Sequence, residues 1–193
     1  LLDYLTIIPE PTQVYSYWHT SDTELRLSFP ADPVTDYRIM LDADYPDRYG
    51  AELGESLLLR YTTGDLSPYA DLSTLGSIGT FNAYTDTQLY ARYRNVTQLD
   101  LKLYELPIQT FMRLYGYGSY TYRRDFRPSS ANLLREWSVP VESERNTTVL
   151  RAIDIVDAEG EQLPPGIYYL EVRDESMDEE DSENMYKLSI MDE

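Results

Sequence analysis

The chain has 193 residues, no cysteine, one histidine and a formal net charge of −18. The absence of cysteine excludes disulfides, thiolate nucleophiles, iron–sulfur clusters and cysteine-based zinc sites, and a single histidine excludes zinc held by several histidines. The strong acidity argues against a nucleic-acid or anionic-membrane partner, because both are bound through clustered Lys and Arg.

The first third of the chain predicts short β-strands. Apolar and polar residues alternate in 24–29, so one face of this segment meets a core and the other meets water. Segments 37–41 and 56–61 continue the alternation, and the intervening segment 45–50 is rich in turn-forming residues. These strands predict a first β-domain over residues 1–64.

Residues 65–78 are polar and turn-rich and show no useful periodicity. This composition predicts a linker between two domains. Alternation resumes in 80–84, 89–94 and 99–104, and the last of these has leucines on every second position with polar residues between them. A second β-domain is therefore expected to begin at residue 79.

One short helix is expected inside the second domain. Pro107 suits the first position of a helix, Gly116 suits its end, and apolar residues follow the proline at helical spacing, namely Ile108, Phe111, Met112 and Tyr115. A helix of about two turns is stable only when it packs on a sheet. The following segment, 116–130, is rich in Gly, Tyr and Arg and is predicted to be a loop.

The remainder of the chain again predicts strands, in segments 136–139, 148–156, 167–172 and 185–190. Residues 157–160 form a predicted turn, and Leu-Pro-Pro-Gly at 163–166 forces an extended entry into the next strand. About seven short strands over residues 79–193 are typical of an immunoglobulin-like sandwich.

Several motifs, taken in order, resemble a known family. The segment 95–104, the proline-led helix and Leu-Pro-Pro-Gly-Ile-Tyr at 163–168 resemble a macroglobulin-type β-sandwich of bacterial alpha-2-macroglobulins. The preceding part resembles the bacterial Ig-like domain found before such a sandwich, through Trp18 and segments 25–27, 37–39, 47–50 and 61–64. That domain normally has earlier strands, so the first domain is expected to be incomplete, which would leave an open sheet edge.

The resemblance implies an all-β chain with two immunoglobulin-like or macroglobulin-like antiparallel sandwiches in tandem. It also implies a structural, non-catalytic part of a large exported bacterial protease-trapping protein, in the periplasm or at the cell surface. The implied partners are neighbouring domains of the parent chain, and proteases through that parent. Neither a bait segment nor the family's Cys-Leu-Glu-Gln thioester motif is identifiable, and a chain without cysteine cannot form the thioester.

A concentration of aromatic and basic residues follows the predicted helix. Tyr and Arg are favoured at recognition surfaces because they bury a large area at low entropic cost. An alternative hypothesis is therefore a cell-surface adhesion or carbohydrate-binding module that binds through this loop, although the tyrosines could instead pack over the helix. The candidate binding residues are Tyr115, Tyr117, Tyr120, Tyr122, Arg123, Arg124 and Arg127.

Two groups of acidic residues carry enough carboxylates to be tested as cation sites. The run 174–183 lacks the spacing of an EF-hand and is predicted to be a solvated connection between strands. Asp42, Asp44 and Asp47 alternate around a turn, and turn formation explains Asp47 sufficiently. We therefore expect no metal and no cofactor.

No catalytic site is predicted. His19 follows Trp18 in a predicted strand, and no nucleophile motif accompanies it. Phosphate-binding loops are also missing from the sequence. A hydrolase that uses paired carboxylates is a third hypothesis, but abundant acidic residues do not by themselves make a site.

Overall fold

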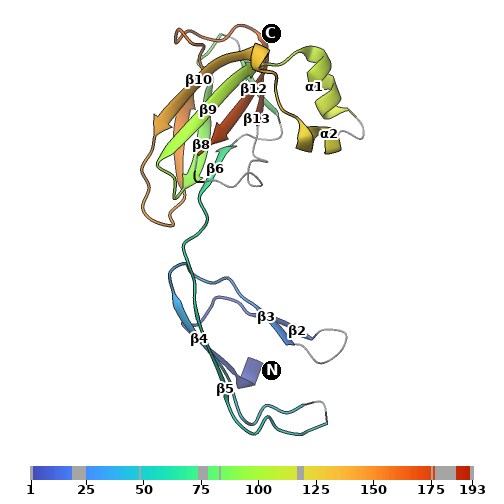
Figure 1. Cartoon of the computed structure of the whole chain (residues 1–193), viewed down its shortest axis with the longest axis vertical. Coiled ribbons are helices and arrows are strands. Elements are labelled where there is room, and N and C mark those ends of the chain that lie inside the picture. Colours follow the sequence, from blue (N-terminus) through green and yellow to red (C-terminus); the bar gives the residue numbers. More distant parts are fainter. Residues whose placement is uncertain are drawn as a thin grey trace. The chain divides into compact units, whose positions relative to one another are not determined.

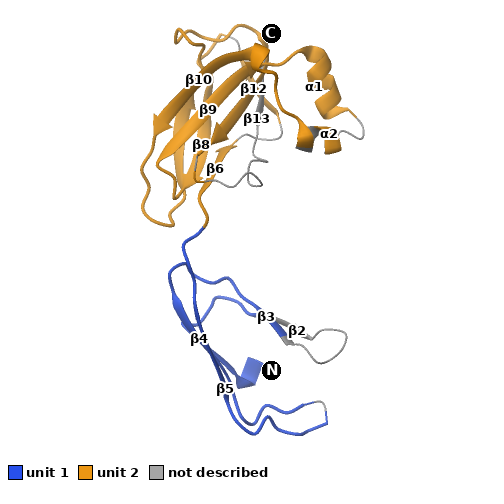
Figure 2. Cartoon of the chain, viewed as in Figure 1, with its two compact units in different colours: residues 1–66 blue, residues 67–193 orange. Residues whose placement is uncertain are grey.

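A computed structural model describes residues 2–18, 25–47, 49–73, 78–82, 84–116, 120–174, 176 and 186–191. Most of these residues lie in or between short β-strands, which confirms the predicted all-β class (Figure 1). The chain divides into two compact units, Leu1–Leu66 and Ser67–Glu193 (Figure 2).

The first unit is built around a small antiparallel sheet. Its strand order is β1-β4-β5, and its register places Ile7 beside Ile39 and Ile39 beside Leu59. Ile7 and Tyr37 are buried on one face, and the Tyr37 ring contacts Phe29 edge to face, with 5.2 Å between centroids. The elements of this unit are η1 (Leu2–Tyr4), β1 (Leu5–Ile8), β2 (Tyr15–Trp18), β3 (Leu25–Ser28), β4 (Asp36–Leu41) and β5 (Leu57–Thr62), with β2 and β3 paired in a separate ladder.

The second unit is a two-layer β-sandwich. One sheet has the order β10-β9-β12-β13-β7, and the other has the order β11-β8-β6. All pairs are antiparallel except β13 with β7. The strands are β6 (Tyr69–Ser73), β7 (Ile78–Asn82), β8 (Gln88–Arg94), β9 (Gln98–Glu105), β10 (Leu133–Pro140), β11 (Val149–Asp154), β12 (Gly166–Arg173) and β13 (Tyr186–Met191).

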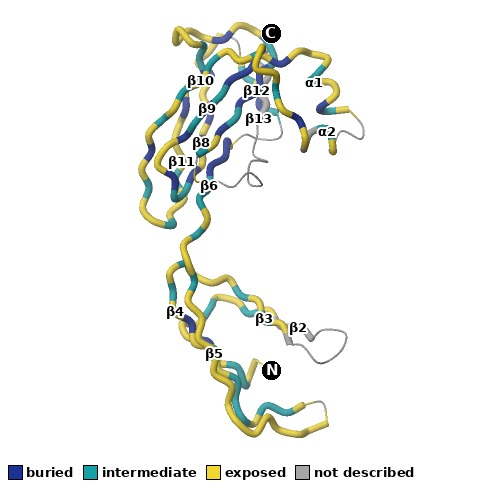
Figure 3. The backbone as a smooth tube through the Cα atoms, in the orientation of Figure 1, coloured by how far each residue is buried: buried dark blue, intermediate teal, exposed yellow. Residues whose placement is uncertain are grey.

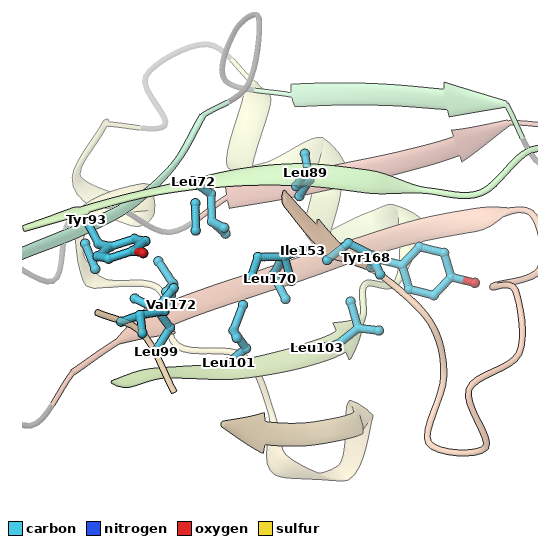
Figure 4. Close-up of a cluster of buried hydrophobic side chains, with 14 of the residues drawn as sticks. Leu72, Leu89, Tyr93, Leu99, Leu101, Leu103, Ile153, Tyr168, Leu170 and Val172 are labelled. Carbon is cyan, nitrogen blue, oxygen red and sulfur yellow. The ribbon is translucent and has the colours of Figure 1, made fainter. Parts of the chain in front are cut away.

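The core of the second unit lies between its two sheets. Leu99, Leu101 and Leu103 of β9 are fully buried, as their alternation predicts, and they face residues of the opposite sheet such as Leu72 and Leu89 (Figure 4). Each buried leucine stabilises the fold by roughly 1.5–3 kcal/mol relative to an exposed one. The sandwich therefore contains a much larger core than the first unit.

The predicted linker over residues 65–78 is wrong in part, because β6 occupies Tyr69–Ser73 within it. This strand pairs with β8, and Ala70 and Leu72 are fully buried. The strand was not predicted because Asp71 lies between these two residues and gives the segment a polar composition. The assignment of residues 1–64 to an Ig-like domain and of 79–193 to a macroglobulin-like one stays a prediction.

Two short helices interrupt the sandwich, although only one was predicted. The first, α1 (Ile108–Tyr115), lies within the predicted 107–116. The second, α2 (Tyr120–Asp125), lies in the segment predicted to be a loop, and a short 3-10 turn, η2 (Ser130–Asn132), follows it. Helices this short are stable only through tertiary packing. The local sequence of α2 has no amphipathic stripe, and the helix was therefore not predicted.

Candidate functional site

The helix α1 packs on the sandwich through only part of the predicted apolar stripe, together with Leu114. Leu114, which is outside the predicted stripe, is fully buried. The half-buried rings of Phe111 and Tyr115 pack in a tilted arrangement, with 4.8 Å between their centroids. Ile108 and Met112, which belong to that stripe, are exposed instead. The predicted helix is present, but its apolar side chains are divided between core and surface.

The helix α2 is attached to the same satellite core. The ring centroids of Tyr122 and Phe126 are 5.8 Å apart. The Phe126 ring contacts Tyr169 of β12 edge to face, with 5.4 Å between centroids. The guanidinium of Arg113 on α1 lies over the Tyr122 ring, 4.7 Å from its centroid. Such a cation–π contact is worth roughly 0.5–1 kcal/mol at an exposed site. Aromatic packing and this cation together hold the two helices against β12.

The structure places the predicted binding residues in different environments. Tyr115 and Tyr122 are half-buried and pack against the satellite core. Arg127 is exposed, and its Nη1 donates to the Phe126 carbonyl at 2.9 Å. The others are not described at the side-chain level, because Tyr117 lies outside the described residues and only the backbone of α2 is described at Tyr120, Arg123 and Arg124. A shared binding surface therefore stays a prediction.

Two buried phenols beneath these helices have perturbed pKa values. Burial, together with the charge of Glu171, raises the pKa of Tyr104 to about 12. The same two causes raise the pKa of Tyr169 further. Both rings pack in the satellite core, and the Tyr104 hydroxyl donates to the Glu171 carboxylate at 3.4 Å, so these tyrosines contribute packing and hydrogen bonding.

A second polar cluster, which sequence reasoning missed, lies on β6 and β8. Arg92 binds the Asp71 carboxylate through two nitrogens, with Nε to Oδ1 at 3.0 Å, and the Tyr69 hydroxyl donates to the same carboxylate. The Asp71 side chain is only 3% exposed, whereas that of Arg92 is 48% exposed. Arg92 also lies over the Tyr69 ring, at 5.6 Å from its centroid.

This Asp71 cluster holds β6 at the edge of its sheet. Bidentate arginine–carboxylate contacts are among the stronger hydrogen bonds in proteins, and the neighbouring Arg94 donates to the Ser67 carbonyl at 3.1 Å, close to the start of the second unit. The Asp71 carboxylate is occupied by these donors and is buried, so the cluster has no free base or nucleophile. Because Asp71 and Ser73 interrupt the apolar residues of 69–73, and Asp71 is itself buried, no local signal distinguished this strand from a linker.

Two aspartates form equivalent turns in the two units. The Asp47 Oδ1 accepts from the backbone nitrogens of Tyr49 and Ala51 at 2.8 and 2.9 Å. The Asp157 Oδ1 accepts from the nitrogens two and four residues later, at 3.0 and 2.7 Å. In both turns the glycine at the third position after the aspartate has a positive φ, of 87° and 85°. Asp47 therefore has the turn-forming role expected of it.

The other acidic candidates contribute little within the described structure. Among the residues whose positions are described, no cluster of three or more acidic or histidine side chains could hold a metal ion. Most of the acidic run 174–183 and His19 lie outside the described residues. Asp174 is described, and its Oδ1 accepts from the Ser176 nitrogen at 2.8 Å in another local turn.

Comparisons with known proteins identify the fold through structure alone. No protein-family model matches the chain, and no curated protein matches its sequence. Along the described residues, no helix is both long and apolar enough to span a membrane.

The chain is similar in structure to alpha-2-macroglobulin of Salmonella. A point mutant of that protein matches with a TM-score of 0.65 and 14% identity over 98% of this chain. The form reacted with methylamine matches with a TM-score of 0.66 and 13% identity over the same share. The chain has a macroglobulin-like fold. This macroglobulin-like chain spans 11% of the length of either Salmonella protein.

Proposed function

We propose that this macroglobulin-like chain is a structural, non-catalytic segment of a large exported bacterial protein of the alpha-2-macroglobulin type. The observation that supports this most strongly is a fold likeness along 98% of the chain to proteins of which it spans only 11%. Such a segment acts by holding adjoining domains in position. Its direct partners are then the neighbouring domains of the same polypeptide, and proteases meet it only through the parent protein, in the periplasm or at the cell surface.

The chemistry of the described residues supports this role. The Asp71 carboxylate is paired with Arg92 and buried, and the Tyr104 phenol, whose pKa is raised to about 12, is protonated at neutral pH as an ordinary tyrosine is. These polar groups serve strand pairing and packing. A rigid spacer requires both, whereas catalysis requires an accessible group whose pKa lies near the working pH.

The proposal is tested by titrating the chain against several proteases of different specificity. We expect the proteases to retain full activity towards a protein substrate at any molar ratio, and to form no stable complex with the chain on a sizing column. Stoichiometric inhibition would overturn the proposal, because trapping would then be a property of this segment itself.

The flanking coding sequence provides a second test. A bait segment or a Cys-Leu-Glu-Gln motif elsewhere in the same open reading frame would support a protease-trapping parent. Repeated adhesin-type modules on both sides would instead favour the alternative hypothesis of a surface adhesion or carbohydrate-binding module.

The exposed side chains of Ile108, Met112 and Arg127 near the two helices favour a test of that alternative. A glycan array would be probed with the chain and with a Tyr117→Ala, Tyr120→Ala double variant. As a matched control, Tyr90→Ala removes an exposed tyrosine from β8. Glycan binding that is lost in the double variant and kept in the control would establish the binding module. No binding to the array would count against it.

A further inference from the structure

The tripeptide Asn-x-Thr occurs in two loops of the second unit. Residues 95–97 connect β8 to β9, and residues 146–148 end the connection between β10 and β11. In exported proteins the asparagine of such a tripeptide can carry an N-linked glycan when it lies at the surface. Because the tripeptide also occurs by chance, the surroundings of each copy determine whether an enzyme can reach it.

The first tripeptide is part of the folded core. Val96 is only 4% exposed and belongs to the cluster of buried residues between the two sheets. The Thr97 carbonyl accepts from the Val141 nitrogen at 3.0 Å. A transferase must hold the asparagine and the threonine in its own site, which would draw Val96 out of the core and break this hydrogen bond. The first copy is therefore inaccessible in the folded chain.

The second tripeptide lies on an exposed connection. Residues 142–148 belong to no strand or helix, and the connection between β10 and β11 is mostly exposed in Figure 3. Thr147 and Thr148 are exposed, and Asn146 is half-buried. The Thr147 nitrogen donates to the Glu144 carbonyl at 3.0 Å and closes a turn. An enzyme can take up this tripeptide without removing a buried side chain from the core.

The residue two positions before each asparagine also differs. Glu144 is exposed and presents a carboxylate, which an arginine of a transferase can bind. Tyr93 holds the equivalent position before Asn95 and is 3% exposed, and its hydroxyl donates to the Glu142 carbonyl at 3.2 Å. The second copy therefore has an accessible, charged flank, and the first has a buried one.

The two asparagines contact each other through different atoms. The Asn146 main-chain nitrogen donates to Asn95 Oδ1 at 2.7 Å, which fixes the orientation of the Asn95 amide, and Asn95 Nδ2 donates to Asn146 Oδ1 at 2.9 Å. Nδ2 is the atom that carries an N-linked glycan. In Asn95 this atom is engaged in the pair, whereas Asn146 takes part through its oxygen and its main chain. A glycan on Asn146 would leave both hydrogen bonds in place.

We propose that Asn146 is an attachment site for an N-linked oligosaccharide and that Asn95 is not. The transfer forms a bond between Asn146 Nδ2 and the anomeric carbon of the first sugar. The bond between that carbon and the diphosphate of a lipid-linked donor breaks, the diphosphate leaves with the bonding electron pair, and Nδ2 releases one proton. This inference rests on the proposed export of the parent protein, because such acceptors are used in secreted chains.

The site is tested on the purified full chain, with a single-subunit oligosaccharyltransferase that accepts any Asn-x-Thr and a lipid-linked oligosaccharide diphosphate as the donor. Synthetic peptides of residues 91–100 and 142–151 serve as unfolded references. Dividing the rate at each site of the chain by the rate for its peptide removes the preference of the enzyme for either sequence. Intact mass then gives the number of glycans on the chain over time.

Threonine variants assign the glycan to one site. Thr148→Ala and Thr97→Ala each remove the hydroxyl of one tripeptide, and both side chains are exposed. Thr147→Ala is the matched control, because it changes an exposed threonine and keeps the tripeptide. The asparagines themselves are not replaced, because both have a left-handed backbone, with φ of 54° and 61°. Melting temperatures establish that each variant is folded.

We expect one glycan per chain, which is lost in Thr148→Ala and kept in Thr97→Ala and Thr147→Ala. The ratio of chain rate to peptide rate should be at least about tenfold higher at Asn146 than at Asn95. Tenfold corresponds to about 1.4 kcal/mol, slightly less than the free energy of burying a valine side chain.

Three results would overturn the proposal. They are equal ratios at the two asparagines, a glycan that persists in Thr148→Ala, and a lack of transfer to the folded chain or to the peptide 142–151. Because the purified components measure access to Asn146 and not export, any of these results would leave the protease titration unaffected. Stoichiometric protease inhibition would, in turn, overturn the proposed function without changing the transfer result.

Discussion

Replacing Asp71 with Asn tests whether the buried carboxylate holds β6 in the sandwich. The substitution keeps the size of the side chain but removes the charge that Arg92 and the Tyr69 hydroxyl contact. Breaking a fully buried ion pair costs about 3–5 kcal/mol. Because Arg92 is 48% exposed and can be rehydrated, Asp71→Asn should lower the free energy of unfolding by only about 2 kcal/mol. For a unit of this size the loss corresponds to a fall in melting temperature of roughly 8 °C.

The assay uses the tryptophans, because each described unit has one. Trp137 packs against the core of the second unit, and Trp18 lies in β2 of the first. In a Trp18→Phe background, the fluorescence of Trp137 during urea unfolding reports on the second unit alone. The two-state free energy of unfolding is then compared with and without Asp71→Asn.

The matched control is Glu136→Gln, which breaks the exposed cross-strand pair between Lys102 and Glu136 (2.9 Å). Both of these side chains are about half exposed, so the pair contributes at most about 1 kcal/mol. If Asp71→Asn destabilised the second unit no more than Glu136→Gln, the inference that burial strengthens the Asp71 contact would be refuted.

Three further predictions concern the second unit, and Gly64 of the first unit is a control in one of them. Leu114→Ala should lower the free energy of unfolding by about 2–5 kcal/mol, measured by urea unfolding, because it leaves a cavity in the core. Met112→Ala on the same helix should change it by less than about 0.5 kcal/mol, because the Met112 side chain is 66% exposed. Gly160→Ala should lower the free energy of unfolding by about 1–2 kcal/mol, because its φ of +85° is unfavourable for alanine. Gly64→Ala should leave the free energy of unfolding unchanged in thermal melts, because Gly64 has no positive φ and open space around it. Because the pKa of Tyr104 is raised in the folded chain, its stabilising contribution is complete below pH 10 and is lost as the pH rises through about 12. The free energy of unfolding should therefore fall between pH 10 and 12. It should fall less steeply in Tyr104→Phe. A stability independent of pH over that interval would contradict this last prediction.

Alternation of apolar and polar residues was sufficient to predict most strands of the second unit. Leu99, Leu101 and Leu103 are fully buried because each projects to the same side of β9, and this periodicity depends only on backbone geometry. The turns at Asp47 and Asp157 were likewise predictable, since an aspartate with a glycine three residues later makes the same local hydrogen bonds in both units.

Features that depend on distant residues could not be predicted. The strand β6 looked like part of a linker because the charge of Asp71 is compensated by Arg92, twenty-one residues away in the sequence. The helix α2 was not predicted because its packing depends on a distant strand: Tyr122 packs on Phe126, and Phe126 contacts Tyr169 of β12. The candidate binding residues are neighbours in the sequence, but packing separates half-buried Tyr122 from exposed Arg127.

The amino-acid sequence by itself determined the all-β class, the period of the strands, the position of α1 and the exclusion of cysteine chemistry, because these follow from local geometry and composition. Only the tertiary structure decided which apolar side chains are covered. Leu114 is buried and Met112 is not, although both lie on one helix, and β5 is exposed although its composition is that of a buried strand. Burial depends on which elements meet in space, and that information is distributed over the whole chain.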